Sequence, residues 1–142
     1  MAQVLIDSDL FSELLAQKDP IVAANAAKYF KEFGNYTISA MTFFESQKGL
    51  TYKPKPKITA ALTAIIQDLI VLPVRKEEAE LGGIIHGLLK QQGRTIGEAD
   101  PVIAATAITY GLTLATANTK HYQFVIDAGF TIQLENWRTP SP

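Results

Sequence analysis

The organisation of this chain is set by residues 93–122, which read GRTIGEADPVIAATAITYGLTLATANTKHY. Two acidic residues, Glu98 and Asp100, open an apolar run that Gly111 ends. A short β-type segment, 112–116, follows, and polar side chains stand at its end: Thr116, Asn118, Lys120 and His121. In open α/β sheets, sites form where strands end and helices begin. The pattern therefore predicts a site here, to which acids from elsewhere in the chain would contribute.

Length and composition restrict the kind of protein. A chain of 142 residues with 47% apolar residues predicts one domain, over residues 1–138, with a frayed tail at 139–142. The absence of cysteine excludes disulfides and thiolate metal sites, and it fits a reducing compartment. The net charge of −1 gives no strong overall attraction to nucleic acid or membrane. Contact with a polyanion would therefore need local basic groups or a bound metal.

The N-terminus lacks the pattern of a signal peptide, and the uncharged stretch 101–118 is interrupted by a proline and a glycine. We therefore expect a cytoplasmic protein that does not associate with membranes.

Apolar periodicity predicts an alternation of strands and helices along the chain. Expected strands are 4–6, 36–39, 70–74, 112–116 and 130–134. For the third strand, Pro73 favours a place at the sheet edge or the end of the strand. Helices are expected over 10–17, from 20 to Gly34, from 42 onward, and over 58–69, 75–92, 98–110 and 121–128, with 52–57 (YKPKPK) as an exposed basic loop. This alternation predicts an α/β fold with a mostly parallel sheet covered on both faces.

Three acids are expected at one edge of that sheet: Asp7, Glu45 and Asp100. Each lies at a strand-to-helix junction or in a first helical turn, and such junctions meet at one edge of a parallel sheet. Clustered carboxylates repel one another and push at least one toward protonation, which a divalent cation relieves. Ligands that are all oxygen suit Mg²⁺ or Mn²⁺, and such an ion supports phosphoryl chemistry.

Each acid also has a simpler structural explanation. Asp7 fits as a cap of the first helix, and Glu45 fits as the partner of Thr42 in a capping box. Asp100 precedes Pro101, which is the pattern of an N-cap followed by proline at the first helical position. Elsewhere, Glu98 fits as a first-turn acid, His86 as a packed helix residue and the lysines of 52–57 as solvated charge. His121 is expected near the site.

The ordered set of motifs resembles a PIN-domain ribonuclease, specifically a VapC-type toxin of a toxin–antitoxin pair. The resemblance covers nearly the whole chain and rests on LIDSD at 5–9, ISAMTFFE at 38–45, IGEAD at 96–100, IAA at 103–105, LATAN at 114–118 and the trailing Trp137. It implies a PIN-like three-layer fold with a sheet of four to five strands. It also implies a metal-dependent endoribonuclease whose partners are RNA, a cognate antitoxin of the VapB type and a second copy of the chain.

The resemblance further implies roles for individual residues. Asp7, Glu45 and Asp100 would hold Mg²⁺ or Mn²⁺, Thr116 and Asn118 would complete the catalytic site, and Ser8 would orient Asp7.

This chain departs from the family pattern in two places. Asp7-Ser8-Asp9 replaces the usual Asp-Thr-Asn, and the loop near His121 lacks the fourth acid of many relatives unless Glu98 or Asp9 substitutes for it. One alternative is therefore a PIN-like module that binds RNA or a partner without cleavage. Another is a haloacid-dehalogenase-type phosphatase with Asp7 as nucleophile.

Overall fold

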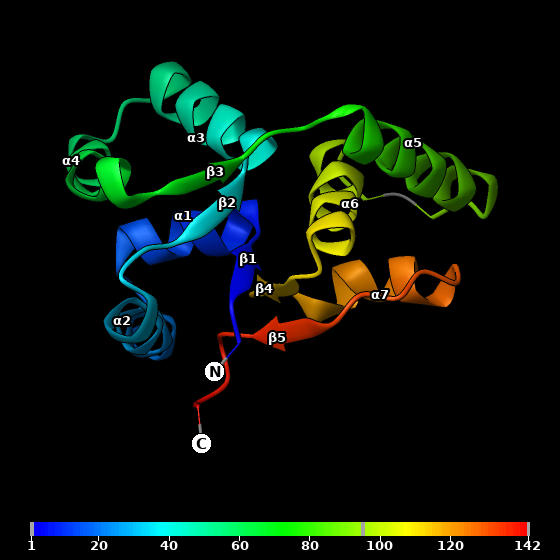
Figure 1. Ribbon diagram of the computed structural model, residues 1–142. Coiled ribbons are helices and arrows are strands. Elements are labelled where there is room, and N and C mark those ends of the chain that lie inside the picture. The colour runs from blue at the N-terminus through cyan, green and yellow to red at the C-terminus, as the bar shows by residue number, and fades with distance from the viewer. Residues whose placement is uncertain (1, 95, 142) are drawn as a thin grey trace.

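A single parallel sheet forms the centre of the computed structural model, which describes residues 2–94 and 96–141. In these residues the strands are β1 (Val4–Ile6), β2 (Thr37–Ser39), β3 (Ile70–Leu72), β4 (Thr113–Thr116) and β5 (Leu134–Asn136). Their order across the sheet is β3-β2-β1-β4-β5, and every pairing is parallel (Figure 1). The chain builds outward from β1 to β3 and then returns to place β4 on the other side of β1. The order therefore reverses between β1 and β4, where α/β sheets open a crevice for ligands.

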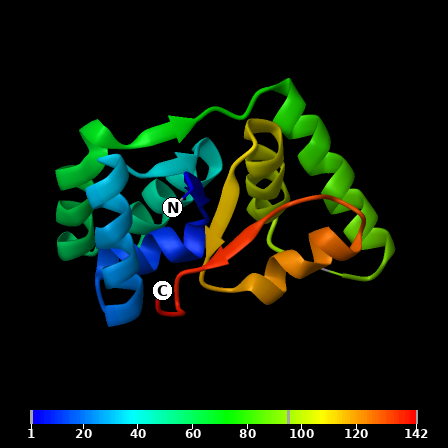
Figure 2. The ribbon, with the colours of Figure 1, turned by 60° about the horizontal axis from the view of Figure 1, so that its bottom comes forward.

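Helices cover both faces of this sheet. They are α1 (Ser8–Ala16), α2 (Pro20–Phe33), α3 (Ala40–Tyr52), α4 (Pro56–Ile65), the short 3₁₀ helix η1 (Ile66–Asp68), α5 (Lys76–Gln91), α6 (Ala99–Tyr110) and α7 (Thr119–Asp127). Figures 1 and 2 show α1 to α4 on one side of the strands and α5 to α7 on the other. The predicted three-layer α/β fold is confirmed. None of the helices in the described ranges is long and apolar enough to cross a membrane.

The apolar strand residues divide between two cores because successive side chains of a strand point to opposite faces. Val4 and Ile6 pack into the core beneath α1 and α2, whereas Leu5 packs into the core beneath α5 and α6. All three residues of β1 are fully buried. This burial explains why β1 reads as a continuous apolar run rather than an alternating one.

The last strand and the loop 52–57 are among the segments whose predicted boundaries are wrong. The last strand is expected over 130–134, but β5 begins at Leu134, which pairs with Leu114 of β4. Phe130 and Ile132 are apolar because they pack against the second core from the connecting loop. The predicted loop 52–57 is also shorter, since Tyr52 ends α3 and Pro56 begins α4. Proline is compatible with a first helical turn, where its missing N–H has no intrahelical partner to lose. The predicted edge position of the third strand is confirmed by β3.

The C-terminal segment lies against α2. Asn25 donates hydrogen bonds to the carbonyl oxygens of Trp137 and Thr139, each at 2.9 Å, and Lys28 Nζ donates to Ser141 Oγ at 2.9 Å. The sequence predicts a frayed tail at 139–142, whereas Thr139 and Ser141 are both held by hydrogen bonds. Pro142 lies outside the described residues.

Candidate active site

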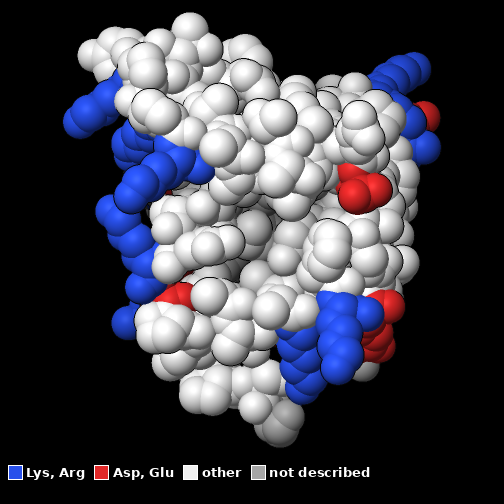
Figure 3. Space-filling view, turned by 90° about the vertical axis from the view of Figure 1, so that its left-hand side faces the viewer, with Lys and Arg blue, Asp and Glu red and all other residues white. Residues whose placement is uncertain are grey.

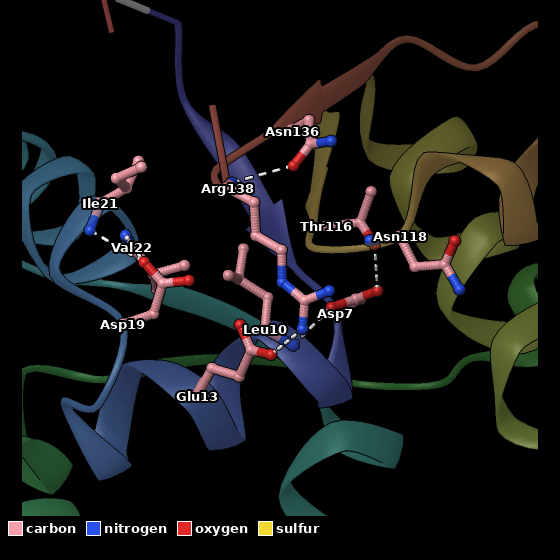
Figure 4. A network of polar contacts seen from close by, with 10 residues as sticks. All are labelled: Asp7, Leu10, Glu13, Asp19, Ile21, Val22, Thr116, Asn118, Asn136 and Arg138. Atoms are coloured by element: carbon pink, nitrogen blue, oxygen red, sulfur yellow. Dashed lines mark hydrogen bonds and ion pairs between the residues drawn. The ribbon is translucent and has the colours of Figure 1, made fainter. Parts of the chain in front are cut away.

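Asp7 lies at the point where the strand order reverses. It follows β1 and caps α1, since its Oδ1 accepts a hydrogen bond from the Leu10 backbone N–H at 2.8 Å. Its Oδ2 accepts a hydrogen bond from Thr116 Oγ1, the last residue of β4, at 2.7 Å. Figure 4 shows this carboxylate between the two strands. Asp7 is therefore a helix cap, as its simpler explanation predicts, and also the acid that joins the two central strands.

Asn118 supports this arrangement through its backbone. Its N–H donates a hydrogen bond to Thr116 Oγ1 at 2.9 Å, which fixes the hydroxyl group that holds Asp7. The Asn118 side chain is exposed and points away from Asp7 in Figure 4. Thr116 therefore contacts Asp7 directly, whereas the Asn118 amide faces solvent, where a bound substrate could reach it.

Burial is the main influence on the ionisation of Asp7. Only 3% of the residue is exposed, and loss of solvent raises the pKa of its carboxyl group from 3.8 to about 6. Hydrogen bonds from Thr116 and Leu10 lower the pKa, and the negative charges of Asp9 and Asp100 raise it further. The predicted shift toward protonation is present, but desolvation contributes more to it than repulsion between the acids. A cation near Asp7 would offset both effects.

Helix α3 begins earlier than the sequence predicts. Ser39 is its N-cap, and the Ser39 side chain accepts a hydrogen bond from the Met41 N–H at 2.9 Å. The predicted capping box of Thr42 and Glu45 is therefore wrong, because Thr42 already lies inside the helix. Glu45 therefore does not cap α3, and its side chain points toward a different helix.

That helix is α1, through Ser8. Ser8 Oγ donates a hydrogen bond to Glu45 Oε1 at 2.5 Å and lies 3.1 Å from Thr42 Oγ1. The sequence-based expectation that Ser8 orients Asp7 is wrong, because Ser8 is the first residue of α1 and its hydroxyl faces α3. Ser8 orients Glu45, and Thr116 has the role toward Asp7 that was expected of Ser8.

Asp100 lies in the first turn of α6 rather than at its N-cap. The helix begins at Ala99, so the predicted N-cap role of Asp100 is wrong. Asp100 Oδ2 accepts a hydrogen bond from the Gly97 N–H at 3.1 Å and lies 2.6 Å from His121 Nε2. The expectation that His121 lies near the site is confirmed, since it contacts one of the three acids directly.

Tyr122 is a site residue that the sequence pattern did not identify. Its hydroxyl donates to Asp100 Oδ1 at 3.4 Å, and only 1% of the residue is exposed. Burial raises the pKa of Tyr122 well above its ordinary value, and the charges of Asp7, Asp100 and Asp9 add to that effect. These acids therefore lie close enough to influence one buried phenol. The sequence signal that could have identified Tyr122 is its position directly after His121.

The chemistry of the three acids suits a divalent metal, but their present arrangement does not enclose one. Asp7, Glu45 and Asp100 offer only carboxylate oxygens, which Mg²⁺ and Mn²⁺ prefer. Within residues 2–94 and 96–141, no group of three or more Asp, Glu or His side chains is positioned to enclose an ion. Hydrogen bonds from Thr116, Ser8 and His121 occupy the carboxylates instead. A metal would therefore have to share or displace these bonds.

Comparison with known proteins identifies the family of this chain. The family model described as PIN domain matches residues 4–126. The chain is similar to Ribonuclease VapC2 of Haemophilus influenzae, with 29% identity over 112 residues, 78% of this chain and 82% of that protein. It is also similar to Ribonuclease VapC1 of Methanocaldococcus jannaschii, with 25% identity over 126 residues, 85% and 87% of the two chains.

A solved structure with a similar fold is that of DNA-bound VapBC from Salmonella typhimurium. The match has a TM-score of 0.79 and 22% identity, and it covers 96% of this chain and 99% of the other. The dehalogenase-type alternative gains nothing from these comparisons. Because the family model spans residues 4–126, which include β1 to β4 and the three acids Asp7, Glu45 and Asp100, this chain belongs to the PIN domain family.

Proposed function

We propose that this protein is a metal-dependent endoribonuclease that acts as the toxin of a VapBC-type toxin–antitoxin pair. The observation that carries the proposal is Asp7, buried at the switch point of the sheet with Asp9 and Asp100 close enough to raise its pKa. A ribonuclease that uses a hard divalent ion needs carboxylates at its site to hold that ion. Two relatives with 25–29% identity, each named as a VapC ribonuclease, support the same class of reaction.

Asp7, Glu45 and Asp100 would hold Mg²⁺ or Mn²⁺ at this site. When bound, the ion would supply Lewis-acid activation of a water molecule and of a phosphodiester oxygen. The chain's own contribution is to orient the three acids. Thr116 holds Asp7, and Ser8 holds Glu45.

Asp100 is held by the side chains that follow β4. His121 and Tyr122 contact its two carboxylate oxygens. Asn118 has an exposed side chain beside this cluster, which suits it to contact the RNA.

RNA cleavage tests the proposal directly. A pool of single-stranded RNA should be cut in Mg²⁺ or Mn²⁺, stay intact in EDTA, and be cut again when metal is restored. Asp7→Asn and Asp100→Asn should each abolish cleavage while circular dichroism shows a folded chain. The matched control is Asp127→Asn, since Asp127 lies at the end of α7 and pairs with Arg94. If folded protein cuts no RNA in either metal, the alternative of a non-cleaving binding module gains.

The partners follow from the same proposal. Solved structures with this fold include VapBC complexes, so we expect a cognate antitoxin of the VapB type for this chain. Co-expression with the product of the adjacent reading frame should give a stable complex in which RNA cleavage is suppressed. The homodimer remains a prediction that light scattering can check. We propose the cytoplasm as the compartment of this protein, because an RNA-cleaving toxin would meet its substrates there.

A further inference from the structure

We propose that the groove between α1, α3 and α4 binds the RNA strand next to the bond that is cut. This inference rests on the proposed ribonuclease function. The groove is a cavity of about 180 Å³, and its lining includes Glu45, Lys53 and Lys55. It therefore joins one of the three acids to two cations within a single depression.

The lining of the groove suits a nucleotide. Leu15, Leu50 and Ile58 supply an apolar surface contributed by three different helices. Ser12 and Ser46 add hydroxyl groups to the same lining. An apolar surface can pack against the face of a base without reading its sequence, while hydroxyl and ammonium groups bind ribose and phosphate.

The two lysines are placed for phosphate contact. Both are exposed and lie in the short link between α3 and α4, and Pro54 and Pro56 restrict the backbone there. Within the described ranges, neither lysine pairs with a carboxylate, whereas Arg75, Arg94 and Arg138 all do. The three arginine charges are paired with carboxylates of the protein itself, whereas the charges of Lys53 and Lys55 remain available to a polyanion.

The surrounding surface agrees with this division of charge. Figure 3 shows the side of the molecule where α2, α3 and α4 lie in Figure 1. Lys and Arg side chains form a band along the left edge of this view and smaller groups at the right edge, while the middle of the face is largely uncharged and hollowed. A chain with a net charge of −1 and acids at its proposed site needs such a local band to hold RNA.

Gly49 lies inside α3 and is one of the residues that line the groove. A Cβ atom built on it would meet nothing within 4 Å, so a larger side chain fits there without a clash. Because Gly49 is part of the lining, we expect such a side chain to take up space in the groove. Gly87 in α5 also has nothing within 4 Å of a Cβ, and α5 lies on the other side of the sheet. It provides a matched control.

The first experiment tests whether the charges of Lys53 and Lys55 contribute to RNA binding. Binding of a fluorescein-labelled, random-sequence single-stranded RNA is followed by anisotropy in EDTA, so that no cleavage occurs. The double variant Lys53→Gln/Lys55→Gln should bind severalfold more weakly, and the slope of log K against log salt should become shallower by about 0.7 for each phosphate that the variant no longer neutralises. The control Lys90→Gln, on exposed α5 surface, should behave as wild type. An unchanged slope in the double variant would overturn the proposal.

The second experiment tests whether RNA occupies the groove, by placing a larger side chain in its lining. Gly49→Leu should weaken RNA binding severalfold and raise KM for cleavage, and Gly87→Leu should do neither. The Mn²⁺-induced rise in Tm should be the same in both variants, because the acids are untouched. If both variants bind RNA normally and Gly49→Leu weakens only the antitoxin complex, the groove belongs to that protein and the proposal is wrong. Wild-type protein that binds RNA but never cuts it in Mn²⁺ would instead count against the proposed function alone.

Discussion

His121 Nε2 lies 2.6 Å from Asp100 Oδ2, so the imidazole ring occupies one of the two oxygens with which Asp100 could bind a metal ion. Both side chains are partly exposed, at 35% and 21%. The contact joins the loop after β4 to the first turn of α6. This contact lies in the region where many relatives are expected to carry a fourth acid. In this chain the region holds a histidine that contacts Asp100 instead.

Replacing His121 should therefore change metal binding before it changes folding. In His121→Ala, Asp100 is freed of a competing partner worth about 0.2–1 kcal/mol, as is usual for partly exposed pairs. We expect the Kd for Mn²⁺ to fall by up to about fivefold. Thermal melts over a range of Mn²⁺ concentrations measure this constant. Weaker Mn²⁺ binding in the variant would mean that His121 is itself a ligand.

Asp7→Asn should stabilise the metal-free protein at neutral pH. Between pH 3.8 and about 6 the folded chain binds more protons at Asp7 than the unfolded chain, so its stability falls as the pH rises through that window. A shift of this size corresponds to ~3 kcal/mol. Asparagine removes this cost but weakens the hydrogen bond with Thr116, so we expect a net gain of about 1–2 kcal/mol.

Urea unfolding in EDTA measures this gain, which should be present at pH 8 and vanish below about pH 4. The variant should also lose the increase in Tm that metal gives the wild type. Lower stability than wild type at pH 8 would show that the buried Asp7 charge is already compensated.

Much of this site could be predicted from the sequence because it depends on the order of the elements. Alternating strands and helices fix a parallel sheet, and a parallel sheet brings Asp7 and Thr116 to the same edge. Their hydrogen bond at 2.7 Å spans 109 residues of chain and follows from that topology. The placement of Asp100 near this edge follows in the same way.

The contacts between helices could not be predicted. The bond between Ser8 and Glu45 depends on how α1 packs on α3, and the contact of His121 with Asp100 depends on how α7 meets α6. A local pattern also misleads where the same residue spacing fits both a capping box and a position inside the helix. Thr42 and Glu45 have the spacing of a capping box, but Ser39 caps the helix three residues earlier.

Ser8→Ala should slow RNA cleavage through Glu45 rather than through the fold. Without the Ser8 hydroxyl, the Glu45 carboxylate loses the hydrogen bond that fixes its direction. Removal of such a supporting group usually costs about 10- to 100-fold in metal affinity or activity. Cleavage rates measured over a range of Mn²⁺ concentrations should show partial rescue at high metal. Ser8→Thr keeps the hydroxyl and should retain most of the activity. An equal decrease in both variants would mean that the serine is needed for packing instead.

Gly82→Ala should destabilise the protein by about 1–3 kcal/mol, because overpacking a tight contact carries a cost of that size. A Cβ on Gly82 of α5 would lie 3.1 Å from the Cα of Val102 in α6, and backbone cannot yield as a side-chain end can. Gly87→Ala, on the exposed part of the same helix, should instead stabilise by up to about 1 kcal/mol through helix propensity. Urea unfolding of the two variants measures both effects. Because α6 carries Asp100, a shift of this helix should also weaken Mn²⁺ binding in Gly82→Ala but not in Gly87→Ala. Equal stability of the two variants would show that α5 and α6 can separate without cost.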